Sequence, residues 1–111
     1  MESYMFITPK ELAQKLHNGK YNCSIGFTDD TEEDALINGE PTGWYGIQIS
    51  NLYDGDCLLI GYYGAGIVYS QNLNMDISVD NIVSAIQEFW NNEFGRKACQ
   101  ICVDKKEYEE V

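Results

Sequence analysis

The sequence has few basic residues and none at all in its middle. Its 111 residues include 18 Asp and Glu but only 7 Lys and Arg, which gives a formal net charge of −11. Residues 21–95 contain twelve Asp and Glu and no Lys or Arg. Phosphate-rich partners, such as nucleic acids and anionic membranes, are bound mainly through Lys and Arg, so neither is expected here. The acidity indicates either solubility alone or a surface that attracts a basic protein.

Long hydrophobic runs are also missing. The longest run, Cys57 to Ile60, has the length of a strand, whereas a membrane-spanning helix needs ~18 apolar residues. The first residues contain neither a positively charged region nor an apolar stretch of signal-peptide length. These absences predict a cytoplasmic protein with no membrane partner.

Cysteine is present at four positions, Cys23, Cys57, Cys99 and Cys102. In the cytoplasm we expect reduced thiols, and we predict that they are buried and structural. Cys99 and Cys102 form a C-x-x-C pair, which is typical of zinc or redox sites. Zinc usually needs a second such pair or nearby histidines. A redox pair begins a helix, whereas residues 98–103 are expected to form a strand, so both interpretations are discounted.

Patterns typical of catalysis are absent from the sequence. The only histidine, His17, falls at the end of an expected helix, where an imidazole complements the helix dipole. No G-x-S-x-G motif occurs, and the glycine-rich residues 61–66 lack the lysine of a phosphate-binding loop. The acidic residues 29–34 lack the alternating ligands and fixed glycine of a calcium loop. We therefore predict a protein that is not an enzyme and holds no metal or cofactor.

Two helices are predicted from their caps and apolar spacing. Thr8 and Glu11 form a capping box ahead of a short apolar stripe, which predicts a helix over residues 9–18. Ser78 caps a longer amphipathic helix, predicted over residues 79–94, whose apolar residues recur with helical spacing. Such a helix is expected to pack on a sheet.

Alternating apolar residues predict five strands, over residues 21–28, 44–50, 57–63, 67–71 and 99–103. Short turns that contain glycine join the middle three strands, which predicts an antiparallel meander. Residues 29–43 are expected to form a long acidic loop, and the charged tail 104–111 is expected to be frayed. The fold class is therefore α+β, a single domain over residues 1–111. We expect an antiparallel sheet of about four to five strands packed against two helices.

Aromatic residues are abundant for so short a chain, with eight Tyr and two Trp. Tyr62, Tyr63 and Tyr69 fall on or next to the expected meander, so at least one sheet face should carry an aromatic side chain with an edge in solvent. Beside carboxylates, such rings form good protein-binding surfaces. They are equally compatible with ordinary sheet residues that bury one end.

Three segments resemble those of the immunity proteins of bacterial polymorphic-toxin and contact-dependent growth inhibition systems. They are ITPKELAQKL (Ile7 to Leu16), LLIGYYGAGIVY (Leu58 to Tyr69) and ISVDNIVSAIQEFW (Ile77 to Trp90). The resemblance is one of layout: an opening helix, a glycine-rich hairpin, a second helix and a closing strand. It implies a protein that binds and neutralises a cognate basic toxin, a nuclease or another toxin that acts on nucleic acids.

If this resemblance holds, acidic side chains cover the basic cleft of the toxin and steer its association. The candidate partner-binding residues lie in the acidic loop and at a hairpin tip: Asp29, Asp30, Glu32, Glu33, Asp34, Asp54 and Asp56. The composition fits a second class equally well, a phage-type inhibitor that mimics nucleic acid and blocks a DNA-binding or nuclease effector. A third class, a small acidic enzyme or ligand-binding domain, requires a concave pocket with convergent polar groups.

Overall fold

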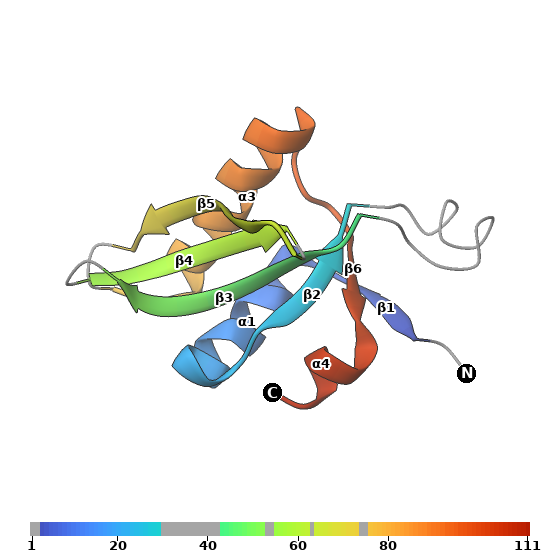
Figure 1. The fold of residues 1–111 in the computed structure, drawn as a ribbon, viewed down its shortest axis with the longest axis horizontal. Helices are drawn as coiled ribbons and strands as arrows, with labels where there is room; N and C mark the ends of the chain where they lie inside the picture. The colour runs from blue at the N-terminus through green and yellow to red at the C-terminus, as the bar shows by residue number, and fades with distance from the viewer. Residues whose placement is uncertain (1–2, 30–42, 53–54, 63, 74–75) are drawn as a thin grey trace.

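The computed structural model describes residues 3–29, 43–52, 55–62, 64–73 and 76–111. Figure 1 shows a curved sheet with helices packed against it. The strands are β1 (Tyr4–Ile7), β2 (Ile25–Thr28), β3 (Tyr45–Leu52), β4 (Gly55–Tyr62), β5 (Gly66–Asn72) and β6 (Ile101–Asp104). The helices are α1 (Pro9–Gly19), α3 (Val79–Phe94) and α4 (Lys105–Glu109), and a 3-10 turn, η1 (Lys20–Asn22), follows α1.

All six strands form one antiparallel sheet in the order β1-β6-β2-β3-β4-β5. The α+β class and the β3-β4-β5 meander are confirmed, but the sheet has six strands rather than four to five. The additional strand is β1, which pairs with β6 near the other end of the chain. Both ends of the chain are thereby placed at one edge of the sheet.

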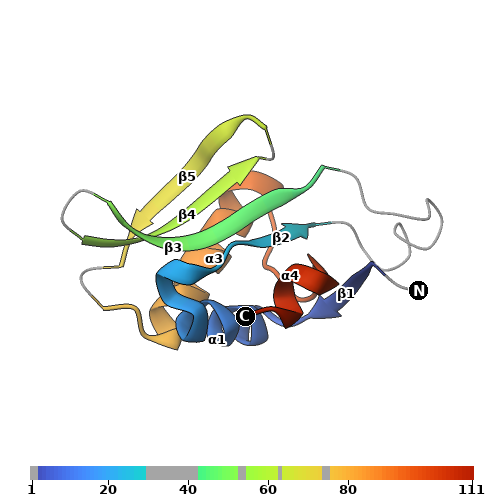
Figure 2. The same cartoon turned by 60° about the horizontal axis from the view of Figure 1, so that its bottom comes forward.

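The two predicted helices are confirmed to within one residue of their predicted ends. At the start of α1, the Glu11 amide donates to Thr8 Oγ1 at 3.2 Å and the Thr8 amide donates to Glu11 Oε1 at 3.2 Å, which is the expected capping box. At the start of α3, the Asn81 amide donates to Ser78 Oγ, and Gly95 ends the helix with a φ of 69°. Seen from the second direction, α1 and α3 lie on the same side of the sheet (Figure 2).

Two predicted strands begin later than expected. The strand expected from residue 21 begins at Ile25, because residues 20–22 form η1 and turn the chain from α1 back into the sheet. The strand expected from residue 99 begins at Ile101. Its predicted start is wrong because Gln87 of α3 binds both backbone groups of Ala98, donating to its oxygen at 3.0 Å and accepting from its nitrogen at 2.8 Å.

The charged tail is not frayed, contrary to the prediction. Asp104 Oδ1 accepts from the Glu107 amide at 3.0 Å and caps the short helix α4. Glu107 also accepts a hydrogen bond from the Gly26 amide of β2, beyond the point where β2 pairs with β6. Lys15 of α1 holds the end of the chain, since its Nζ donates to the Val111 carbonyl at 3.3 Å.

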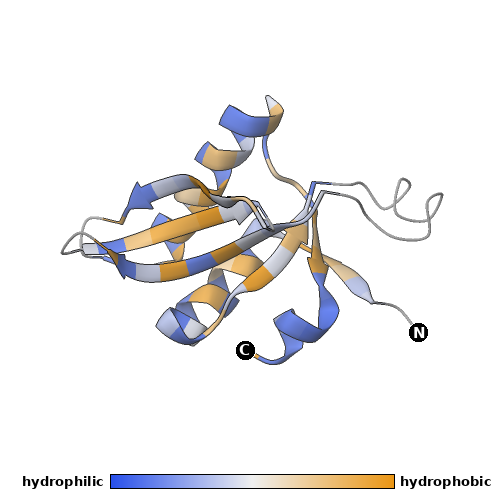
Figure 3. Ribbon diagram, viewed as in Figure 1, coloured by the Kyte–Doolittle hydropathy of each residue, from blue (hydrophilic) through white to orange (hydrophobic). Residues whose placement is uncertain are grey.

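The main core lies between the sheet and helices α1 and α3. Trp90 of α3 stacks on Phe27 of β2 with ring centroids 5.1 Å apart, and both side chains are fully buried. Leu12 and Leu16 bury the apolar stripe of α1 in the same cluster. Colouring by hydropathy shows apolar residues on the strands and on parts of both helices (Figure 3). Burial of this face is the main source of stability.

Candidate functional site

The face of β2, β3 and β4 opposite α1 and α3 is called the open face. Along these strands, pairs whose side chains enter the core, such as Ile25 opposite Ile47, alternate with pairs that face the other side of the sheet. The pairs on the open face include Gly26 opposite Gly46 and Gly46 opposite Gly61. In Figures 1 and 2 no helix of the described part of the chain lies over this face of the meander. Gly26 is buried, so Gly46 and Gly61 are the glycines of this row that leave backbone as the surface of the sheet, because glycine adds no side chain.

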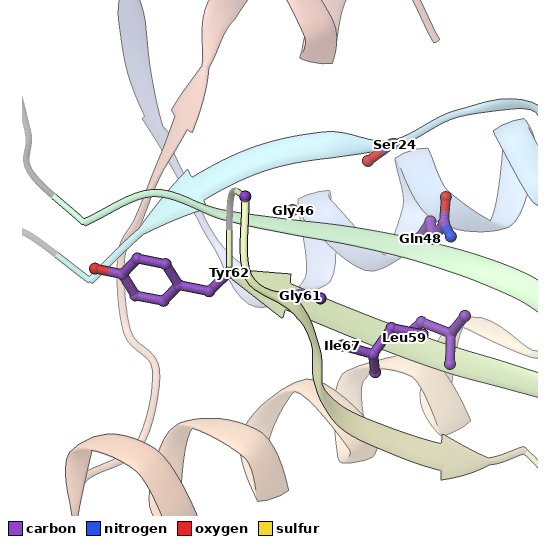
Figure 4. A pocket seen from close by; sticks show the side chains of 9 residues that line it. Ser24, Gly46, Gln48, Leu59, Gly61, Tyr62 and Ile67 are labelled. Atoms are coloured by element: carbon purple, nitrogen blue, oxygen red, sulfur yellow. The ribbon is translucent and has the colours of Figure 1, made fainter.

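A groove of about 240 Å³ lies over Gly46 and Gly61 of this row. Polar side chains of Ser24 and Gln48 and apolar side chains of Leu59 and Ile67 line it (Figure 4). Gly61 is required by packing, because a Cβ there would meet the Gly66 carbonyl oxygen at 3.0 Å. The groove is shallow and of mixed polarity, which suits contact with a protein surface better than enclosure of a small molecule.

A second hollow of about 420 Å³ adjoins the first and shares Tyr62 with it. Trp44 and Asp104 also line this hollow. Tyr62 is 41% exposed and meets Tyr45 edge to face, with ring centroids 4.8 Å apart. In Figure 4 its ring points away from Gln48 and Leu59. Tyr62 is therefore an aromatic side chain with an edge in solvent; Tyr63 lies outside the described residues.

Among the large apolar side chains in the described part of the chain, the two most exposed lie on β5, next to the groove. Ile67 is 57% exposed and Val68 is 51% exposed. Tyr69, in contrast, turns inward and stacks on Phe89 of α3 with ring centroids 5.4 Å apart. Ile67 and Val68 were not singled out from the sequence. The sequence predicted a strand over residues 67–71, but only the sheet order shows that this strand is at an edge.

The sheet order turns the charge pattern of the sequence into a spatial one. We call residues 21–95 the central segment, and residues 3–20 and 96–111 the terminal segments. The central segment contributes β2, β3, β4 and β5, four adjacent strands without Lys or Arg, and also α3, which has none. The terminal segments contribute β1 and β6 at one edge, together with α1 and α4, and carry all seven Lys and Arg.

Asp29 and Asp56 are the two predicted partner-binding residues that the structure describes; Asp30, Glu32, Glu33, Asp34 and Asp54 lie outside the described residues. Asp29 follows β2 and forms an ion pair of 3.7 Å with Arg96. Asp56 is the second residue of β4 and accepts a hydrogen bond from the Tyr21 hydroxyl. They stand beside opposite ends of β3, eight residues apart in register and therefore roughly 26 Å apart at ~3.3 Å per residue. The structure does not bring these two carboxylates together.

Two carboxylates of α3 lie beside tyrosines of the sheet. Burial first, and then the carboxylate of Glu93, raises the pKa of Tyr45 to about 12. The Tyr45 hydroxyl donates to Glu93 at 3.3 Å. Burial and the carboxylate of Glu88 likewise raise the pKa of Tyr69 to about 12. Glu88 and Glu93 are exposed, and sequence reasoning did not select them because helix residues at the surface give no signal of their neighbours.

The cysteines and the histidine form no reactive centre in the described part of the chain. All four cysteines are free thiols; Cys57 and Cys102 are buried, Cys23 is half-buried and Cys99 is exposed. The prediction of a buried thiol is therefore wrong for Cys99, which lies in the turn before β6. Among residues 3–29, 43–52, 55–62, 64–73 and 76–111, no group of three or more His, Cys, Asp or Glu is placed to hold a metal.

No helix in the described ranges combines the length and the apolar character needed to cross a membrane. Comparison with protein-family models, with curated proteins and with solved structures gives no match to this chain.

Proposed function

We propose that this protein is an immunity or inhibitor protein that neutralises a cognate basic toxin, a nuclease or another toxin that acts on nucleic acids. One observation carries the proposal: four adjacent strands and α3 contain no Lys or Arg, while the seven basic residues are confined to the terminal segments. The layout of the three segments that resemble toxin-immunity proteins supports the same class.

The proposed mechanism follows from the chemistry of the toxin. An enzyme that acts on nucleic acid presents Lys and Arg to the phosphates of its substrate. An acidic partner of the right shape occupies that surface and excludes the substrate. Long-range attraction accelerates the encounter, and exposed side chains such as Tyr62, Ile67 and Val68 supply the apolar contact that holds the complex.

The first test identifies the partner. Tagged protein is used to capture binding proteins from the source cell, and the captured proteins are eluted with salt. We expect a basic protein that is toxic when expressed alone and harmless when expressed together with this chain. If the proteins that elute are acidic, or if co-expression gives no protection, the proposal is wrong. A captured DNA-binding protein that is not toxic would favour the nucleic-acid mimic.

The second test locates the electrostatic surface on the complex with that toxin. The variant Asp80→Asn/Glu88→Gln removes two exposed carboxylates of α3, and the matched variant Glu109→Gln/Glu110→Gln removes two exposed carboxylates near the C-terminus. Both change the net charge equally. We expect the α3 variant to slow association about two- to fivefold at low salt and to flatten its salt dependence. Equal effects of the two variants would contradict a localised acidic surface.

Neutralising the five predicted loop residues tests the other candidate contact. We expect Asp29→Asn, Asp30→Asn, Glu32→Gln, Glu33→Gln and Asp34→Asn together to slow association and reduce its salt dependence. A salt-independent rate for the unmodified protein would rule out electrostatic steering altogether.

A further inference from the structure

The two edges of the sheet differ in how well they are protected against pairing. β1, at one edge, has four residues, none of them fully exposed. β5, at the other edge, has seven residues, of which five are exposed. Its sequence, GIVYSQN, contains no proline and no charged residue. Edge strands of soluble proteins are usually short, charged or interrupted by proline, because unpaired backbone groups recruit other strands. β5 has none of these three protections, and its one departure from a regular edge is the bulge described next.

A β-bulge presents apolar side chains at this edge. Ile60 of β4 is opposite Tyr69, whereas the next residue, Gly61, is opposite Ile67. Val68 is therefore the extra residue of the bulge, with no partner on β4. Bulges turn side chains away from the regular pleat, and Ile67 and Val68 are both more than half exposed. Ile67 also lines the groove of the open face, so the edge and the groove form one continuous surface.

The charges around this edge select the occupant. The adjacent strands β2, β3, β4 and β5 contain no Lys or Arg. On α3, the side chains of Asp80 and Glu88 are exposed. Tyr69 of β5 stacks on Phe89 of α3 with ring centroids 5.4 Å apart, so the neighbouring residue Glu88 lies on the part of α3 that packs against β5. A second copy of this chain would bring two such carboxylate-bearing surfaces together. An extended segment with Lys or Arg is complementary to them.

We infer that β5 is a docking edge for an extended, basic segment of the partner protein, which adds a seventh strand to the sheet. Backbone hydrogen bonds to β5 supply the alignment, as in other cases of strand addition. Alternate side chains of the added strand meet the Ile67–Val68 surface, and its basic side chains meet the carboxylates of α3. The inference rests on the proposed function, since it states how the basic partner is held.

The test uses a defined peptide as the probe, so that it does not depend on finding the partner. Isotope-labelled protein is titrated with a peptide of about seven residues that alternates Val and Lys, a usual strand length. We expect amide hydrogen exchange to slow at least about tenfold in β5 and to remain unchanged in β1. A peptide that alternates Val and Glu should give no protection. Protection by both peptides, or binding of the Lys peptide without protection of β5, would overturn the inference.

Two matched variants distinguish the effect of the β5 edge on peptide binding from the effect of net charge. Val68→Lys places a cation on β5, and Ser84→Lys places the same cation on the exposed surface of α3. We expect Val68→Lys to weaken binding of the Val-Lys peptide about tenfold or more and Ser84→Lys to weaken it less. Equal weakening would show that only net charge matters and would overturn strand addition. A dimer of the unmodified chain that Val68→Lys dissociates would assign β5 to a second copy instead.

The inference and the proposed function fail separately. If the captured toxin is neutralised equally well by the unmodified protein and by Val68→Lys, docking on β5 is wrong and the inhibitor function stands. If the Val-Lys peptide protects β5 but no basic toxin is neutralised by the chain, the docking edge stands and the proposed function is wrong.

Discussion

The terminal and central segments use their charged residues differently. In the terminal segments, charges serve the fold: Glu11 completes the α1 cap, Lys15 holds the Val111 carbonyl and Glu107 accepts from the β2 backbone. In the central segment, Asp80 and Glu88 lie exposed on α3 with no basic residue in the same segment. The terminal segments therefore combine charges of both signs in closing the structure. The central segment has charges of one sign only; some of them, such as Asp29 with Arg96, also serve the fold, while others remain exposed.

The same contrast holds for apolar side chains. On the side of the sheet under α1 and α3, Phe27 of β2 and Trp90 of α3 are fully buried against each other. At the β5 edge, Ile67 and Val68 remain more than half exposed. Isolated exposed apolar residues are ordinary, but these two are adjacent on an uncharged edge strand beside a groove, which is the basis of the docking edge proposed above. The difference separates the part of the central segment that folds the protein from the part that is available to a partner.

The largest effect is expected where the central segment folds the protein. Trp90→Ala should reduce the free energy of unfolding by about 3–5 kcal/mol, because it removes a fully buried ring that stacks on Phe27. Urea denaturation at neutral pH measures the loss. The control is Val68→Lys, which changes an exposed residue and should cost within about 0.5 kcal/mol. A loss of similar size for both variants would contradict the division between a folding face and a free edge.

The second largest effect is expected in the terminal segments. Glu107→Ala leaves the Gly26 amide of β2 without its acceptor and releases α4 from the sheet. An unsatisfied buried donor costs about 1–3 kcal/mol, so we expect a loss of that size in urea denaturation. Glu107→Gln keeps an acceptor oxygen and should restore part of the stability. Glu109→Ala, in the same helix but exposed, should change little. If Glu109→Ala were as harmful, α4 would be held by something other than this carboxylate.

Local signals were sufficient for the helices and the meander but not for the ends of the sheet. Thr8 with Glu11, Ser78 and Gly95 mark helix ends within a few residues of themselves, so α1 and α3 were predictable. β1 has only four residues, and its partner β6 lies more than ninety residues away, so nothing local marks it as a strand. Such pairing is decided by long-range packing.

The α4 helix had a local signal that the charge of the tail obscured. Asp104 and Glu107 have the spacing of a helix cap, and the structure shows the cap.

The candidate site was less predictable than α4. The stretch without Lys or Arg was visible in the sequence. That β5 is an edge strand, and that Val68 is the extra residue of a bulge, depends on strand order and register. Neither can be obtained from the alternation of residues along one strand.

The smallest effect, and the one that compares the two regions most directly, is the response to alkaline pH. Tyr45 has its pKa raised to about 12 from the ordinary value of about 10, first by burial and then by Glu93. Above about pH 10 the unfolded chain therefore loses the Tyr45 proton while the folded chain keeps it. The stability due to this tyrosine is complete below pH 10 and is lost as the pH rises towards 12. The slope is up to about 1.4 kcal/mol per pH unit.

Tyr45→Phe should remove the Tyr45 part of the measured slope and leave the part due to Tyr69, whose pKa is also raised to about 12. Glu93→Gln should reduce the Tyr45 part, because the neutral amide no longer opposes ionisation. Urea denaturation at several pH values between about 9 and 11 measures the slope. Tyr108 of α4 is the matched tyrosine of the terminal segments; burial, and then Glu11, raise its pKa as well, but Lys15 stands over its ring at 4.8 Å. We expect Tyr108→Phe to flatten the slope less than Tyr45→Phe. If Tyr108→Phe flattened the slope more than Tyr45→Phe, the cation beside Tyr108 would not offset the nearby carboxylate. The proposed difference between the terminal and central segments would then be wrong.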